Sequence, residues 1–242
     1  MMRKILYINR NIKMANTEAT MYQLKETKTR AKIILFDLDG TLIDSTEAIL
    51  ESFEKAYMSF GKDVPSAESI KSLIGLPLEM MFVKLGVDDS AKMAYVKAYK
   101  EHYQTIHTEK TVLLPRAKEA VALAAEHGRL GVVTTKTSEY SRILLEHFDI
   151  MKYFDIVIGR EDVTHPKPHP EPVERAMNAL GYHYGKVTYM IGDTTADLIA
   201  AEEAEIGGIG VLCGYMGKEE LTEHADFIAK DAYEAVQIIE KI

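Results

Sequence analysis

The chain has 242 residues, a length that fits one large domain or a core with a smaller companion. Its 37 acidic and 29 basic side chains give a net charge of −8, which argues against a protein that binds nucleic acid through a broad basic face. A single cysteine, Cys213, excludes an internal disulfide, and no apolar run approaches the ~18 residues of a membrane span, so we expect a cytoplasmic protein that does not enter a membrane.

Basic residues are concentrated at the start of the chain. Residues 1–31 contain seven basic and two acidic side chains. This segment is an N-terminal extension for which the residues indicate no role, and Lys4–Ile8 is a candidate edge strand within it.

Short, mainly apolar runs alternate with helical patterns from residue 32 onward. The runs at 32–36, 130–133, 154–158, 187–191 and 206–212 predict buried strands. Helical patterns cover 115–127, with Gly128 as a C-cap, and then 138–148, 172–180, 194–204 and 231–242. Strands that alternate with helices in this way predict an α/β fold with a parallel sheet.

One long interval breaks the alternation. Residues 45–114 contain helical patterns and no convincing strand; one of these patterns places Ile49, Phe53, Tyr57 and Phe60 on one face. We therefore predict a helical second domain at 45–114, inserted into a core made of 32–44 and 115–242.

Polar residues follow four of the predicted strands. Because ligands bind outside the carboxyl ends of parallel strands, these residues are the candidates for a site. They are Asp37, Asp39, Gly40 and Thr41; Thr134, Thr135 and Lys136; Lys167; and Asp193 with Asp197.

These residues occur in four motifs. The segment 37–45 (DLDGTLIDS), Thr134, Lys167 before Pro168, and the segment 192–197 (GDTTAD) resemble the motifs of the haloacid dehalogenase superfamily. The helical insert resembles the cap of its phosphoglycolate phosphatase-like branch. The resemblance implies a Rossmann-like core, an α-helical cap, and Mg²⁺-dependent phosphoryl transfer through an aspartyl-phosphate. It also implies metal ligation by the Asp37 carboxylate, the Asp39 backbone carbonyl and Asp193, with Asp197 outside the direct ligands.

The side-chain chemistry agrees with phosphoryl transfer. Asp37 is the candidate nucleophile, and Asp39 is the candidate general acid that later activates water. Thr134 and Lys167 supply hydrogen-bond donors to the phosphate. Carboxylates that converge at one sheet edge need a cation, and oxygen ligands favour Mg²⁺. Candidate substrate-binding residues are Gly40, Thr41, Thr135 and Gly75.

The choice of substrate stays open at this point. A small phosphorylated metabolite, foremost phosphoglycolate, is favoured because the cap loop 73–79 offers Leu76 and Leu78 but few polar groups, which predicts a small pocket. Thr135, and the segment 161–163 leading to 167–172, are similar to bacterial pyrophosphatases of this branch. The sequence is also compatible with a sugar-phosphate phosphatase, with a mutase of the β-phosphoglucomutase kind and with a catalytically silent regulatory protein. It is compatible with a monomer and with a homodimer.

Overall fold

The computed structural model describes residues 32–183 and 185–242, so the extension 1–31 and its candidate strand lie outside the described residues. Its main sheet has six parallel strands in the order β5-β4-β1-β6-β7-β8. Their bounds are β1 Lys32–Phe36, β4 Gly128–Val133, β5 Ile156–Ile158, β6 Thr188–Gly192, β7 Gly207–Val211 and β8 Phe227–Ala229. The α/β fold with a parallel sheet is thereby confirmed.

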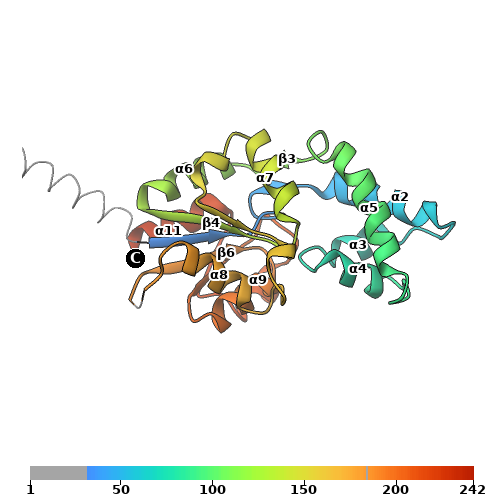
Figure 1. Ribbon diagram of the computed structural model, residues 1–242. Helices are drawn as coiled ribbons and strands as arrows, with labels where there is room; N and C mark the ends of the chain where they lie inside the picture. Colours follow the sequence, from blue (N-terminus) through green and yellow to red (C-terminus); the bar gives the residue numbers. More distant parts are fainter. Residues whose placement is uncertain (1–31, 184) are drawn as a thin grey trace, which may run out of the picture.

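Helices cover both faces of this sheet (Figure 1). The covering helices are α6 Ala117–His127, α7 Ser138–His147, α8 Glu171–Ala179, α9 Thr195–Glu203 and α11 Ala232–Lys241. In the central strand β1, Ile34 and Phe36 join the apolar cluster that includes α6, α7 and α11, whereas Ile33 and Leu35 join the cluster that includes α8 and α9. Alternate side chains point to opposite faces, which is why β1 is apolar throughout.

Four helices between β1 and β4 lie together, away from those that cover the sheet (Figure 1). They are α2 Thr46–Ser59, α3 Ala67–Lys71, α4 Leu78–Lys84 and α5 Lys92–Ile106. They bury a separate apolar cluster in which Phe53, Phe82 and Tyr99 pack ring against ring. This separate core supports the division at 44/45 and 114/115, which we propose as the domain boundaries.

Short elements account for most differences from the predicted pattern. An antiparallel pair, β2 Ile43–Asp44 and β3 Val112–Leu113, joins the two ends of the helical insert. The short helix α10 Lys218–Thr222 and the edge strand β8 were not predicted either, because segments this short carry little periodic signal. Two 3₁₀ turns lie at Met151–Tyr153 and Arg160–Asp162. None of the described helices is long and apolar enough to cross a membrane.

Candidate active site

The loop after β1 carries the first cluster of polar residues. The backbone N–H of Asp37 donates to the carbonyl of Ile191 at 2.9 Å, which ties the end of β1 to β6. Gly40 has φ +87°, and a Cβ at this position would lie 2.2 Å from Oδ2 of Asp193. Only glycine allows the loop to turn this tightly against the Asp193 carboxylate. Gly40 therefore shapes the site through its backbone.

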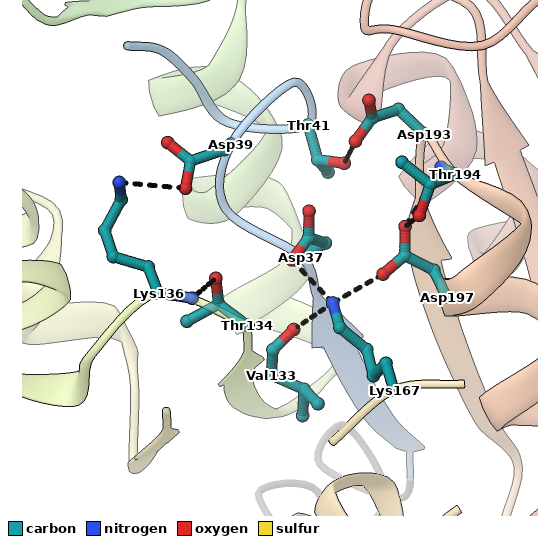
Figure 2. A network of polar contacts seen from close by, with 10 residues as sticks. All are labelled: Asp37, Asp39, Thr41, Val133, Thr134, Lys136, Lys167, Asp193, Thr194 and Asp197. Carbon is teal, nitrogen blue, oxygen red and sulfur yellow. Dashed lines mark hydrogen bonds and ion pairs between the residues drawn. The ribbon is translucent and has the colours of Figure 1, made fainter. Parts of the chain in front are cut away.

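Lys167 joins two of the predicted site carboxylates. Its Nζ lies 2.6 Å from Oδ1 of Asp37 and 2.8 Å from the carbonyl oxygen of Val133, and it also donates to Oδ1 of Asp197 (Figure 2). The Lys167 side chain is 2% exposed. All three N–H groups of the ammonium thus have partners, so Lys167 is held rigidly beside Asp37. Oδ2 of Asp37 has no hydrogen-bond partner among the described residues.

Asp193 and Asp197 complete a cluster with Asp37. One carboxylate oxygen from each of these three buried residues lies within 4.8 Å of the other two. Asp193 accepts from the Thr41 hydroxyl at 3.0 Å and from the backbone N–H of Tyr215 at 2.9 Å. Three carboxylates with one lysine leave an excess of negative charge in a buried space, which a divalent cation would neutralise.

Asp197 differs from Asp193 in how its oxygens are occupied. Oδ2 accepts from the backbone N–H of Thr194 at 3.0 Å and from the Thr194 hydroxyl at 2.7 Å, while Oδ1 accepts from Lys167. Asp197 therefore orients Lys167 and caps α9 at the same time. This arrangement supports the expectation that Asp197 lies outside the direct metal ligands, which stays a proposal.

Burial and neighbouring negative charges raise the pKa values of Asp37 and Asp193. Burial raises the pKa of Asp37 to about 7, because the opposing effect of Lys167 is incomplete and Asp197 adds to the increase. Burial also raises the pKa of Asp193 well above its usual value, with further contributions from Asp37 and Asp197. Both shifts have the same origin, since these carboxylates are crowded together away from water.

These shifts predict how a divalent cation changes stability with pH. An acid whose folded pKa is raised binds more protons when folded than when unfolded, so its contribution to stability falls as pH rises from about 4 to about 7. A cation that binds the ionised carboxylates reverses this loss. We expect the increase in melting temperature caused by about 5 mM MgCl₂ to be larger at pH 8 than at pH 5, as measured by thermal denaturation. The same Mg²⁺-induced increase in melting temperature at both pH values would contradict a cation site here. An Asp193→Asn variant with the same increase as the wild-type protein would contradict it too.

Asp39 lies apart from this cluster and has its own partners. It accepts from the Ser45 hydroxyl, and its Oδ2 lies 3.1 Å from Nζ of Lys136 (Figure 2). Lys136 also donates to the hydroxyl of Tyr103 in α5 at 2.9 Å. Burial lowers the pKa of Lys136, but Asp39 and Tyr103 outweigh it, so the net pKa is raised. Lys136 stays positively charged, and it links the core to the cap.

Thr134 and Thr135 occupy the end of β4 next to Lys136. The backbone N–H of Thr134 donates to the carbonyl of Ile158 at 3.0 Å, and its hydroxyl accepts from the backbone N–H of Lys136 at 3.2 Å. Figure 2 shows Thr134 beside the Asp37–Lys167 pair, as the motif order predicts. Thr135 lines a cavity between the core and the cap.

A cavity of about 520 Å³ extends from Asp39 between the core and the cap. Apolar side chains of the cap form much of its wall, among them Ile49, Phe53, Ile74, Leu76 and Val96. Charged residues also line it: Asp39, Glu79, Lys92, Lys100, Lys136, Arg160 and Glu161. The prediction of a small pocket is therefore wrong, whereas the loop 73–79 adds only Glu79 to the charged lining. The loop 73–79 alone suggested a small pocket, whereas α5 and the core loops contribute most of the charged lining.

Two contacts close the cap loop against the core. Arg160 donates from Nε to Oε1 of Glu79 at 2.8 Å, which forms an ion pair between two residues that line the cavity. Gly75 has φ +106°, and a Cβ there would lie 2.9 Å from Cγ2 of Thr194. The loop thus reaches Thr194, the residue that follows Asp193.

Gly75→Ala tests the cap loop. The added Cβ meets Thr194 in a backbone conformation that alanine rarely adopts, so the loop must move away from the core. We expect kcat/KM for phosphoglycolate, the substrate that the sequence favours, to fall about 10- to 100-fold and to fall more than kcat/KM for an aryl phosphate.

Gly86→Ala is the matched control. Gly86 has φ +90° but open space at its Cβ position, so it carries the backbone strain without the contact. Equal losses of activity in Gly75→Ala and Gly86→Ala would show that closure at Thr194 is unimportant.

A second group of metal-capable side chains lies at the surface near Lys167. The rings of His165 and His169 stack with centroids 4.6 Å apart, and Oε2 of Glu171 lies 3.2 Å from Nδ1 of His165. The two backbone N–H groups of Thr164 and His165 also donate to Glu171. These contacts order the loop that presents Lys167.

The family model for haloacid dehalogenase-like hydrolases matches residues 34–211. The chain belongs to this family. Its parallel-sheet core and its inserted helices are those of a haloacid dehalogenase-like hydrolase, and the family supports a phosphatase activity. The predicted resemblance is confirmed.

Individual relatives agree with this assignment. The chain is 34% identical over 210 residues to a protein of Dickeya dadantii described as a probable phosphatase, IndB, covering 84% of this chain and 91% of the relative. It is 32% identical to the pyrophosphatase PpaX of Oceanobacillus iheyensis, covering 86% and 96%, and 31% identical to a phosphoglycolate phosphatase of Aquifex aeolicus, covering 76% and 86%. A haloacid dehalogenase-like hydrolase from Streptococcus pneumoniae superposes with a TM-score of 0.77 at 25% identity, covering 86% and 97%.

Proposed function

We propose that this haloacid dehalogenase-like phosphatase hydrolyses a small phosphorylated metabolite through a phosphorylated Asp37, with phosphoglycolate as the foremost substrate. The observation that carries the proposal is the environment of Asp37. Lys167 holds one of its oxygens at 2.6 Å and leaves the other without a partner among the described residues. Asp39, two residues later, borders the cavity that would receive the leaving group.

The donor set of the carboxylate cluster fits a hard divalent cation. Asp37, Asp193 and the backbone carbonyl of Asp39 would hold Mg²⁺ in this proposal, and oxygen donors are the ligands that Mg²⁺ prefers. When bound, the ion would withdraw charge from the phosphate oxygens. Thr41 and the backbone of Tyr215 keep the Asp193 carboxylate in place for this purpose.

The protein's own groups account for both halves of the reaction. Asp37 attacks phosphorus, so that an Asp37–phosphorus bond forms while the bond to the leaving oxygen breaks. Asp39 gives its proton to the leaving oxygen. Asp39 then takes a proton from water, which attacks phosphorus and releases phosphate from Asp37. Thr134 donates to a phosphate oxygen, and Lys167, oriented by Asp197, exchanges its contact with Oδ1 of Asp37 for one with a phosphate oxygen.

Pyrophosphate is the second candidate substrate. Relatives called pyrophosphatase PpaX match this chain over nearly their full length, as the 96% coverage in Oceanobacillus iheyensis illustrates. Thr135 is one of the residues in which this chain is similar to bacterial pyrophosphatases, and it borders the cavity that would receive the leaving group. A sugar phosphate and a mutase reaction are third and fourth candidates.

A parallel screen of phosphate release separates these candidates. Phosphoglycolate, pyrophosphate, glucose 6-phosphate and a nucleoside monophosphate are compared by kcat/KM at saturating Mg²⁺. We expect phosphoglycolate to exceed the sugar phosphate and the nucleotide by about 10-fold or more, the size of one charge-assisted hydrogen bond. A nucleotide or a sugar phosphate as the best substrate would contradict the proposal, and pyrophosphate as the best would favour the second candidate.

A further inference from the structure

Among the described residues, Lys136 is the mostly buried cation near Asp39 that the proposed reaction does not use. It lies in the loop after β4, its side chain is 9% exposed, and it lines the cavity on the leaving-group side. Its Nζ contacts Oδ2 of Asp39 at 3.1 Å and the hydroxyl of Tyr103 at 2.9 Å, and it lies 4.6 Å from the centre of the Tyr103 ring. The charge is therefore placed next to the group that would face the leaving oxygen.

The cations of the site differ in how many of their N–H donors have partners. Lys167 is fully occupied by Asp37, Asp197 and Val133. Among the other cations that line the cavity, Arg160 is paired with Glu79 and Lys92 with Asp89, and Lys100 has no ion-pair partner among the described residues. Lys136 differs from Lys100 because it contacts Asp39.

Lys136 has a donor to spare. An ammonium group has three N–H donors, and the described residues provide Lys136 with two partners. One donor is therefore left for a ligand in the cavity. A mostly buried positive charge with a spare donor binds an anion more strongly than it binds a neutral group, because less water competes for it than at an exposed site.

We propose that Lys136 recognises a negative charge on the leaving group, which makes phosphate esters of hydroxy acids, and pyrophosphate, the substrate class. This inference rests on the proposed phosphatase reaction, in which Asp39 faces the leaving oxygen. A cavity of about 520 Å³ is larger than glycolate requires. Charge next to Asp39, rather than a tight fit, then distinguishes these substrates from neutral sugars and nucleosides.

The test compares two esters of similar size. Phosphoglycolate has an anionic leaving group, and 2-hydroxyethyl phosphate has a neutral one. The measured quantity is the preference, defined as kcat/KM for phosphoglycolate divided by kcat/KM for 2-hydroxyethyl phosphate. We expect Lys136→Met to reduce this preference about 10- to 100-fold, the effect of losing a charge-assisted hydrogen bond.

Three further variants separate charge from structure. Lys136→Arg keeps the charge and should retain much of the preference, whereas Lys136→Gln keeps a donor without the charge and should lose it. Lys97→Met removes a lysine of α5 whose side chain is 77% exposed and should leave the preference unchanged. Circular dichroism and the melting temperature establish that each variant is folded.

The outcomes distinguish the two proposals. Suppose that the wild-type protein hydrolyses both esters and that the Lys136→Gln variant has the same preference as the wild-type protein. This result would overturn the role of Lys136 and leave the phosphatase reaction standing. A wild-type protein that prefers the neutral ester would overturn it too. A wild-type protein that releases phosphate from neither ester would overturn the proposed function, and the role of Lys136 with it.

Discussion

Asp37→Asn is expected to abolish phosphate release, with kcat falling by about 10⁴-fold or more, because the amide cannot form the bond to phosphorus. The substitution is nearly isosteric, and it removes a buried carboxylate whose pKa is raised to about 7 by burial. The fold should therefore persist, with Lys167 still held by Asp197 and by the carbonyl of Val133. The measurement is release of nitrophenolate from an aryl phosphate at saturating Mg²⁺, together with a thermal melt.

Asp88→Asn is the control for this substitution, because Asp88 is exposed and lies in the cap far from the carboxylate cluster in sequence. It should retain wild-type activity. If Asp37→Asn kept more than about a tenth of the wild-type rate, a covalent role for Asp37 would be wrong.

Removal of the divalent cation is the second change with a large expected effect. Without a cation, Asp37, Asp193 and Asp197 repel the phosphate and one another across less than 4.8 Å. We expect a chelator such as EDTA to reduce turnover at least about 100-fold and excess Mg²⁺ to restore it. Activity that is unchanged in the chelator would contradict the assignment of a metal site.

Two isosteric variants locate the cation more closely. Asp193→Asn should raise the Mg²⁺ concentration needed for half-maximal activity by about 30-fold or more. Asp197→Asn should instead lower kcat with little change in that concentration, because Asp197 holds Lys167 and Thr194 with its oxygens. Equal metal requirements in the two variants would remove Asp193 from the ligands and leave the requirement for a cation intact.

The strand and motif pattern predicts that the carboxylates and Lys167 come together at one sheet edge, and their catalytic roles stay predictions. The carboxyl ends of parallel strands meet at one sheet edge, so residues 37, 134 and 193 had to be neighbours once β1, β4 and β6 were adjacent. The segment from Val163 to Glu171 carries Lys167 to the same edge. Asp197 follows as part of the first turn of α9.

The strand and motif pattern could not predict the contacts between the cap and the core. Arg160 and Glu79 are 81 positions apart, and their pairing depends on how the cap lies on the sheet. Lys136 directly follows the two predicted threonines, and yet its contact with Tyr103 depends on the position of α5. The cavity volume depends on the same placement, which explains why loop composition gave a pocket that was too small.

Trapping of the covalent intermediate tests the central claim most directly. An aryl phosphate with a good leaving group, such as 2,4-dinitrophenyl phosphate, needs no proton donor, so the Asp39→Asn variant should still transfer the phosphoryl group to Asp37. The variant no longer activates water, so the phosphorylated protein should accumulate. We predict a burst of about one equivalent of dinitrophenolate per active site, with the phosphoryl group found on the peptide that contains Asp37 after acid quenching and mass spectrometry. Hydroxylamine should remove it, and the Asp37→Asn, Asp39→Asn double variant should show neither burst nor label. A burst with the phosphoryl group on any other residue, or turnover that persists in the double variant, would contradict the account.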